Sequence, residues 1–99
     1  MKVIWKYPLE VVDEQHVEMP PGAEILSAGM ATDGITATLA IWALCESNAR
    51  PLIHRRIYVR GTGNMLGSEI DAQDHIATVP MVIGGRTLIW HIFDGGETR

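Results

Sequence analysis

The chain lacks several features that mark specialised classes of protein. Its 99 residues include a single cysteine, Cys45, so neither an intrachain disulfide nor a cysteine-based zinc site can form. The longest apolar stretch, from Ala37 to Cys45, is far too short to span a bilayer. Lys2 follows Met1, and no apolar segment of signal-peptide length comes after it. These absences predict a cytoplasmic protein with no membrane segment.

The composition is that of an ordinary globular domain. Apolar residues make up 46% of the chain and charged residues 20%, which excludes a disordered chain. Twelve acidic and eight basic residues give a formal net charge of −4, whereas a general binder of long nucleic acid would normally be basic. We therefore expect one domain over residues 1–99, without long nucleic acid as a partner.

The pattern of apolar and turn-forming residues predicts an all-β fold. Short segments rich in β-branched and aromatic residues alternate with glycine- and proline-rich turns. The expected strands are residues 3–7, 16–19, 25–30, 35–46, 52–60, 76–83 and 87–93. Seven such strands predict a small antiparallel β-sandwich or barrel. Ser68 and Asp71 weakly resemble a helix start, so at most one short helical turn is expected near residues 68–75.

Smaller features refine this prediction. Asp33-Gly34 is expected to form a tight turn, Pro80 predicts an edge strand or a bend, and residues 94–97 are expected to begin a frayed tail. In the fourth segment, even spacing predicts a core-facing side. That side consists of Ile35, Ala37, Leu39, Ile41, Ala43 and Cys45.

Charge is distributed unevenly along the chain. Residues 47–68 contain no acidic residue but hold Arg50, Arg55, Arg56 and Arg60, a local charge of +4. The remaining residues carry four basic and twelve acidic groups, or −8, and the two parts sum to −4. A basic strand is therefore expected within an acidic protein.

Strand alternation turns this basic segment into a candidate site. If Ile53, Ile57 and Val59 face the core, the intervening side chains share the opposite face at a spacing of roughly 7 Å. Arginine, histidine and tyrosine side chains can bind a phosphate or carboxylate, and glycines let the backbone approach an anion closely. The candidate ligand-binding residues are His54, Arg56, Tyr58, Arg60 and Thr62. Alternatively, the arginines pair with acidic residues of neighbouring strands or of another subunit.

Other polar clusters predict no catalytic or metal chemistry. Asp71, Asp74 and His75 match no defined metal-binding loop and are interpreted as a solvated loop. His91 is expected to be half-buried and hydrogen-bonded, and His16 to be exposed. Because no nucleophile, base and orienting group can be assigned, we expect a protein that is not an enzyme and that needs no cofactor.

Several strings of residues carry a family resemblance. They are Ile4-Trp5-Lys6-Tyr7-Pro8-Leu9, Met19-Pro20 with Gly22-Ala23, Ile41-Trp42-Ala43-Leu44, Arg56-Ile57-Tyr58-Val59-Arg60-Gly61-Thr62-Gly63 and Leu88-Ile89-Trp90-His91-Ile92-Phe93. In this order, and over nearly the whole chain, they resemble a family of small uncharacterised proteins of tailed phages and prophages. The resemblance implies a phage or prophage origin and an accessory role, and it supplies no established activity.

Together these features give two main functional hypotheses, and an enzyme acting on nucleotides or phosphoesters ranks below both because no catalytic set can be assigned. The first is a non-enzymatic phage accessory protein that sequesters a small anionic ligand, such as a cyclic nucleotide immune signal of the host, by analogy with other small phage proteins. Three tryptophans and open sheet edges predict a homo-oligomer. The alternative is a protein-interaction module that inhibits or redirects a host protein.

Overall fold

The computed structural model describes residues 1–32 and 34–98, and within them the chain is all β apart from one turn of 3-10 helix. The strands of this part of the chain are β1 (Lys2–Pro8), β2 (Glu14–Met19), β3 (Glu24–Thr32), β4 (Ala37–Glu46), β5 (Ile53–Gly61), β6 (His75–Ile83) and β7 (Arg86–Thr98). The predicted fold class is confirmed. The predicted turn at Asp33-Gly34 begins at a residue outside the described chain.

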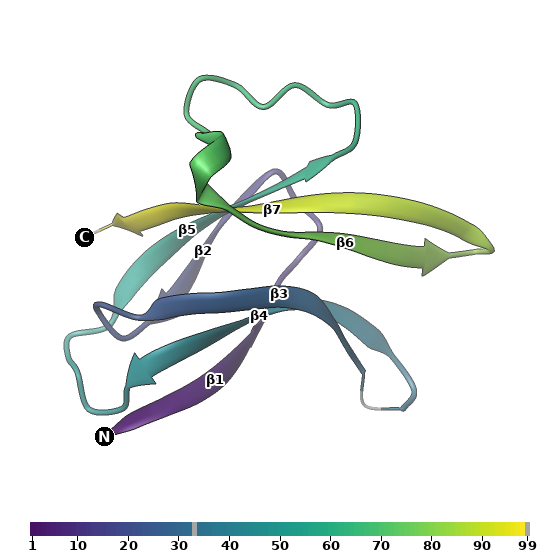
Figure 1. The fold of residues 1–99 in the computed structure, drawn as a ribbon. Helices are drawn as coiled ribbons and strands as arrows, with labels where there is room; N and C mark the ends of the chain where they lie inside the picture. Colours follow the sequence, from purple (N-terminus) through teal and green to yellow (C-terminus); the bar gives the residue numbers. More distant parts are fainter. Residues whose placement is uncertain (33, 99) are drawn as a thin grey trace.

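The strands form two antiparallel sheets stacked as a sandwich (Figure 1). One sheet has the order β1-β4-β3 and the other has the order β2-β5-β7-β6. The chain crosses between the layers after β1, β2 and β4, whereas β3–β4 and β6–β7 are hairpins within one sheet. The sheets approach each other most closely at β3 and β6. The two hairpins extend from the same side of the sandwich (Figure 1).

The core lies between the sheets and follows the predicted alternation only in part. Leu39, Ile41, Ala43 and Cys45 of β4 are fully buried, as predicted. Ile35, however, is 92% exposed, and β4 begins only at Ala37, which is itself exposed. The prediction was wrong there because the end of β3 and the start of β4 bend away from the second sheet, so their inner face is left uncovered (Figure 1).

The predicted frayed tail is instead part of β7. A bulge at Gly95 lets β7 remain paired with β5 as far as Thr98. The Thr98 hydroxyl donates to the carbonyl oxygen of His54 at 3.1 Å, and a Glu97 carboxylate oxygen accepts from the Gly22 N–H at 2.7 Å. Glycine composition therefore marked a bulge within a strand rather than its end.

The 3-10 turn and Pro80 both lie at or next to β6, the edge strand of the second sheet. The 3-10 turn, Ala72–Asp74, lies within the predicted range, but Asp71 caps it by accepting from the Gln73 N–H at 2.9 Å. Pro80 lies in β6, which is an edge strand, as predicted. No segment of the described chain forms a helix long and apolar enough to cross a membrane.

Candidate functional site on the four-stranded sheet

Strand β5 arranges the candidate residues by simple alternation. Ile53, Ile57 and Val59 are buried in the core, as the sequence predicts. The outer face of the sheet therefore carries His54, Arg56, Tyr58 and Arg60, and Thr62 follows in the turn after the strand. The five residues are spread along a strand, and Arg60 and Thr62 line different hollows, of about 580 and 320 Å³.

Strand β2 adds alternating acidic groups and a histidine to the same face. Its register places Glu18 opposite His54, His16 opposite Arg56 and Glu14 opposite Tyr58. A Glu18 carboxylate oxygen lies 3.8 Å from His54 Nε2. Carboxylates therefore stand beside the basic groups that the sequence assigned to a ligand.

Glu14 lies between two basic side chains. Its carboxylate is 3.3 Å from His16 Nε2 and 3.7 Å from Arg56 Nε. The second distance is too long for a hydrogen bond. Arg56 Nε is buried and makes no hydrogen bond within residues 1–32 and 34–98. The side chain of Arg56 is nevertheless 36% exposed, so its terminal guanidinium nitrogens are open to solvent.

Arg55 points to the core side of β5 and makes the strongest ion pair of the segment. Its Nε and Nη2 donate to the two oxygens of Asp94 at 2.8 and 2.7 Å, and its Nη1 donates to the carbonyl of Ala23 at 2.8 Å. Burial alone would raise the pKa of Asp94, but the hydrogen bonds from Arg55 and from the Gly96 N–H outweigh it and lower that pKa. The hydrogen bond to Asp94 raises the pKa of Arg55.

Arg60 is the least exposed outer cation of β5. Its Nη2 donates to Glu69 at 3.3 Å, and its Nη1 donates to the carbonyl oxygen of Asp13. Its guanidinium carbon lies 5.5 Å from the centre of the Tyr58 ring, which allows a cation–π contact. Tyr58 itself is only 3% exposed. Arg60 is therefore engaged within the chain.

Most of the arginines that make residues 47–68 basic are therefore paired with groups of the same chain. Arg55, Arg56 and Arg60 each lie within 4 Å of a carboxylate. Arg50, in the loop before β5, donates instead to the backbone carbonyls of Ser47 and Ala49. The alternative raised by the sequence, that the arginines pair with acidic residues of neighbouring strands, describes Arg55 and Arg56, whereas Arg60 pairs with Glu69 in the loop after β5.

A chain of hydrogen bonds joins Thr62 to a second group of side chains on the same face. Thr62 Oγ1 lies 2.8 Å from His91 Nε2, and His91 Nδ1 lies 3.0 Å from Thr78 Oγ1. Thr78 Oγ1 also lies 2.9 Å from His75 Nε2. This imidazole–hydroxyl chain, Thr62–His91–Thr78–His75, crosses β7 from the end of β5 to β6. His91 is half-buried and hydrogen-bonded, as predicted.

Sequence reasoning missed the contribution of the neighbouring strands. Glu14, His16 and Glu18 alternate along β2, which is a visible signal for one shared face. The sequence does not reveal that this face lies beside β5, since β5 pairs with β2 and β7 and not with the next strand along the chain. Thr78 likewise reaches His91 only through the β6–β7 register.

Comparison with known proteins adds a family and no activity. No curated protein and no solved structure matches the chain. A family model described as a domain of unknown function, DUF7352, matches residues 1–99. The chain therefore belongs to the DUF7352 family.

Proposed function

We propose that this chain is a non-enzymatic binding protein that contacts a host protein through the outer face of the four-stranded sheet. The family strings in the sequence support a phage or prophage origin, and with it a location in the host cytoplasm. The observation that carries the proposal is the pairing on this face: His54, Arg56 and Arg60 each face a carboxylate. Such a surface presents alternating charges, which suit a complementary protein surface better than a single anion.

The remaining side chains of the face are consistent with an interface. Arginine is enriched where proteins meet, and the exposed side chains of His16 and His54 add hydrogen-bonding groups, whereas Tyr58 is buried and adds no contact area. With a net charge of −4, the chain would associate fastest with a basic partner. The preferred partner is therefore a host protein with a basic contact surface.

A catalytic role fits the imidazole–hydroxyl chain poorly. Thr62 and His91 have the spacing of a nucleophile and a base. The group that holds the other imidazole nitrogen is the neutral hydroxyl of Thr78, whereas hydrolases of this kind use a carboxylate to stabilise the imidazolium. We therefore retain a non-enzymatic function.

Arg56 favours a second candidate function, the binding of a small anion. It is the most exposed arginine of β5, at 36% against 11% for Arg60, and it has His16 opposite and His54 two residues away. A phosphate or carboxylate of a ligand such as a cyclic nucleotide could accept from the guanidinium in a bidentate manner. Glu14 and Glu18 oppose this candidate because they supply negative charge at the same place.

One pair of variants tests both candidates. Arg56→Gln changes the outer face, and Arg50→Gln makes the same charge change in an exposed loop. Calorimetry against cyclic nucleotides and ADP-ribose isomers is paired with affinity capture from bacterial lysate. A stoichiometric protein that Arg56→Gln binds less well than Arg50→Gln supports the protein partner. Heat from a small anion that disappears only in Arg56→Gln supports the second candidate. Neither signal from the folded wild type would refute both.

A further inference from the structure

The outer face of the three-stranded sheet is apolar at its centre. The alternation of β4 turns Trp42 and Leu44 outward, and Ile4 lies beside Leu44 on β1 with 56% of its surface exposed. A Cβ atom at Gly29 of β3 would lie 3.8 Å from Cζ3 of Trp42, so the indole extends over β3 at a position without a side chain. This face, which we call the tryptophan face, has an apolar centre of Ile4, Trp42 and Leu44, in which Ile4 is exposed and the other two are partly exposed.

Two lysines and a glutamate lie at the flanks of the tryptophan face, and the two flanks have opposite sign, whereas Glu46 at the end of β4 is paired with the amino group of Met1. Lys2 and Lys6 lie on β1, and Lys6 pairs in register with Trp42. Glu24 lies on β3 opposite Leu44. None of these three side chains forms an ion pair with another part of the chain that the structure describes. One flank is therefore positive, the other negative, and both are unpaired.

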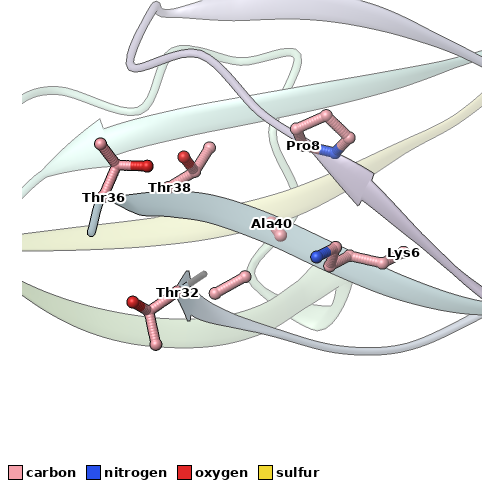
Figure 2. Close-up of a pocket in the computed structure, with 7 residues that line it drawn as sticks. Lys6, Pro8, Thr32, Thr36, Thr38 and Ala40 are labelled. Carbon is pink, nitrogen blue, oxygen red and sulfur yellow. The ribbon is translucent and has the colours of Figure 1, made fainter. Parts of the chain in front are cut away.

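A shallow hollow at one end of this face shows how Lys6 is held. It measures about 210 Å³, and Figure 2 shows that the Lys6 side chain lies along the sheet beside Ala40. Ala40 is only 1% exposed, because long side chains such as that of Lys6 cover it. The Lys6 ammonium group is therefore carried on a flexible stem at the surface and can turn toward an acceptor on another molecule.

We propose that the tryptophan face binds a second copy of this chain in a two-fold dimer. With the two-fold axis parallel to β4 between facing sheets, β4 lies over β4 and β1 of each copy lies over β3 of the other. Lys2 and Lys6 of each copy then lie near Glu24 of the other copy. These two sets of charges flank an apolar centre in which the two Trp42 side chains meet. An axis perpendicular to the strands would set lysine against lysine, so the charges select the first arrangement.

This dimer is independent of the proposed function, because the two surfaces lie on opposite sides of the sandwich. Loss of dimerisation would leave partner or anion binding on the four-stranded sheet untouched. Loss of that binding would likewise say nothing about the dimer.

Charge exchange between the flanks tests the dimer. Sedimentation velocity of the wild type is expected to show a monomer–dimer equilibrium at micromolar concentrations. Glu24→Lys makes both flanks positive, and the pair Lys2→Glu with Lys6→Glu makes both negative, so each variant alone should dimerise at least about tenfold more weakly. An equimolar mixture of the two should form a heterodimer, because each positive flank then meets a negative one.

The control is Glu18→Lys, which makes the same charge change as Glu24→Lys but on the opposite face. It should dimerise like the wild type. All of these substitutions are at exposed positions, and circular dichroism checks that each variant is folded. A wild type that stays monomeric at several hundred micromolar, or a dimer that the flank variants and their mixture leave unchanged, overturns the proposal.

Discussion

The outer faces of the two sheets differ in how closely side chains pack over a glycine and in whether their charged groups are paired. On the four-stranded sheet, Gly95 lies beneath the side chains of Arg56 and Tyr58, and polar groups are engaged with one another. On the tryptophan face, Gly29 lies beneath one indole at an ordinary contact distance, and the charged flanks have no partner in the chain. The outer face of the four-stranded sheet is therefore crowded, and its charged groups have partners within the chain. The tryptophan face is more open, and its charged flanks have no such partners. Four matched comparisons between variants of the two faces measure this difference in monomeric protein.

The largest difference is expected between two glycine-to-alanine substitutions. A Cβ at Gly95 would lie 2.7 Å from Cε2 of Tyr58 and 3.0 Å from the backbone oxygen of Arg56. Gly95→Ala should therefore lower the free energy of unfolding by about 2–3 kcal/mol. Gly29→Ala meets only Trp42, at 3.8 Å, and should leave stability unchanged or slightly raise it. Urea unfolding measures both, and equal losses would remove the contrast between the faces.

The ion pair at the border of the core should make stability depend on pH. Because the folded state has a lower pKa at Asp94 than the unfolded state, this carboxyl adds stability above its unfolded pKa. That stability is lost as the pH falls through the folded pKa. Asp94→Asn should cost about 1–2 kcal/mol at neutral pH and flatten the acidic limb of the stability profile.

Glu24→Gln on the tryptophan face is the matched carboxyl-to-amide control. Glu24 has no ion pair in the described chain, so its substitution should change the monomer little at any pH. The free energy of unfolding, measured between about pH 7 and pH 3, distinguishes Asp94→Asn from Glu24→Gln. An acidic limb that keeps its slope in Asp94→Asn would show that other carboxyls dominate it.

Removal of one hydroxyl should have a smaller effect. Thr78→Val takes away the group that bonds both His91 and His75 and should cost about 1 kcal/mol. Thr38→Val, on the tryptophan face, removes an exposed hydroxyl and should cost almost nothing. Thermal unfolding compares them, and imidazole NMR signals should move in Thr78→Val alone. Unchanged histidine signals would contradict the hydrogen-bonded chain.

The smallest effect is expected for the exposed ion pair of Glu14 and Arg56. A double-mutant cycle with Glu14→Gln and Arg56→Gln should give a coupling of about 0.5 kcal/mol or less, because solvent reaches both groups. The same cycle with Lys6→Gln and Glu24→Gln should give no coupling in the monomer. Coupling there at monomeric concentrations would mean that the flanks of the tryptophan face interact within one chain.

Local sequence rules predicted those features that depend on one strand or turn. The strands, the outward direction of His54 and Arg56, and the edge position of Pro80 all follow from alternation, turn residues and the missing proline N–H. The prediction of a frayed tail at residues 94–97 was wrong because a glycine pair can either end a strand or form a bulge. At Gly95 the bulge is favoured by the close packing beneath Tyr58, which the sequence does not show. The exposure of Ile35 could not be predicted for a similar reason, since it depends on how the β3–β4 hairpin bends relative to the other sheet (Figure 1).

The partners of the candidate residues were beyond local rules. Glu14 and Arg56 are brought together by the pairing of β2 with β5, which skips the intervening strands of the chain. Uneven charge along the sequence revealed the basic segment, but charge along a chain does not indicate charge in space. The acidic surplus identified as a general feature of the exterior supplies specific neighbours to Arg55, Arg56 and Arg60.

The imidazole–hydroxyl chain also has a direction. The Thr78 hydroxyl has a single proton, so it donates to either His75 or His91 and accepts from the other. Neutral His91 has one N–H, and moving it from Nδ1 to Nε2 reverses every bond from Thr62 to His75. A change at either end therefore sets the tautomer at the other, and the outer face of the four-stranded sheet can present two patterns of donors and acceptors from one arrangement of heavy atoms.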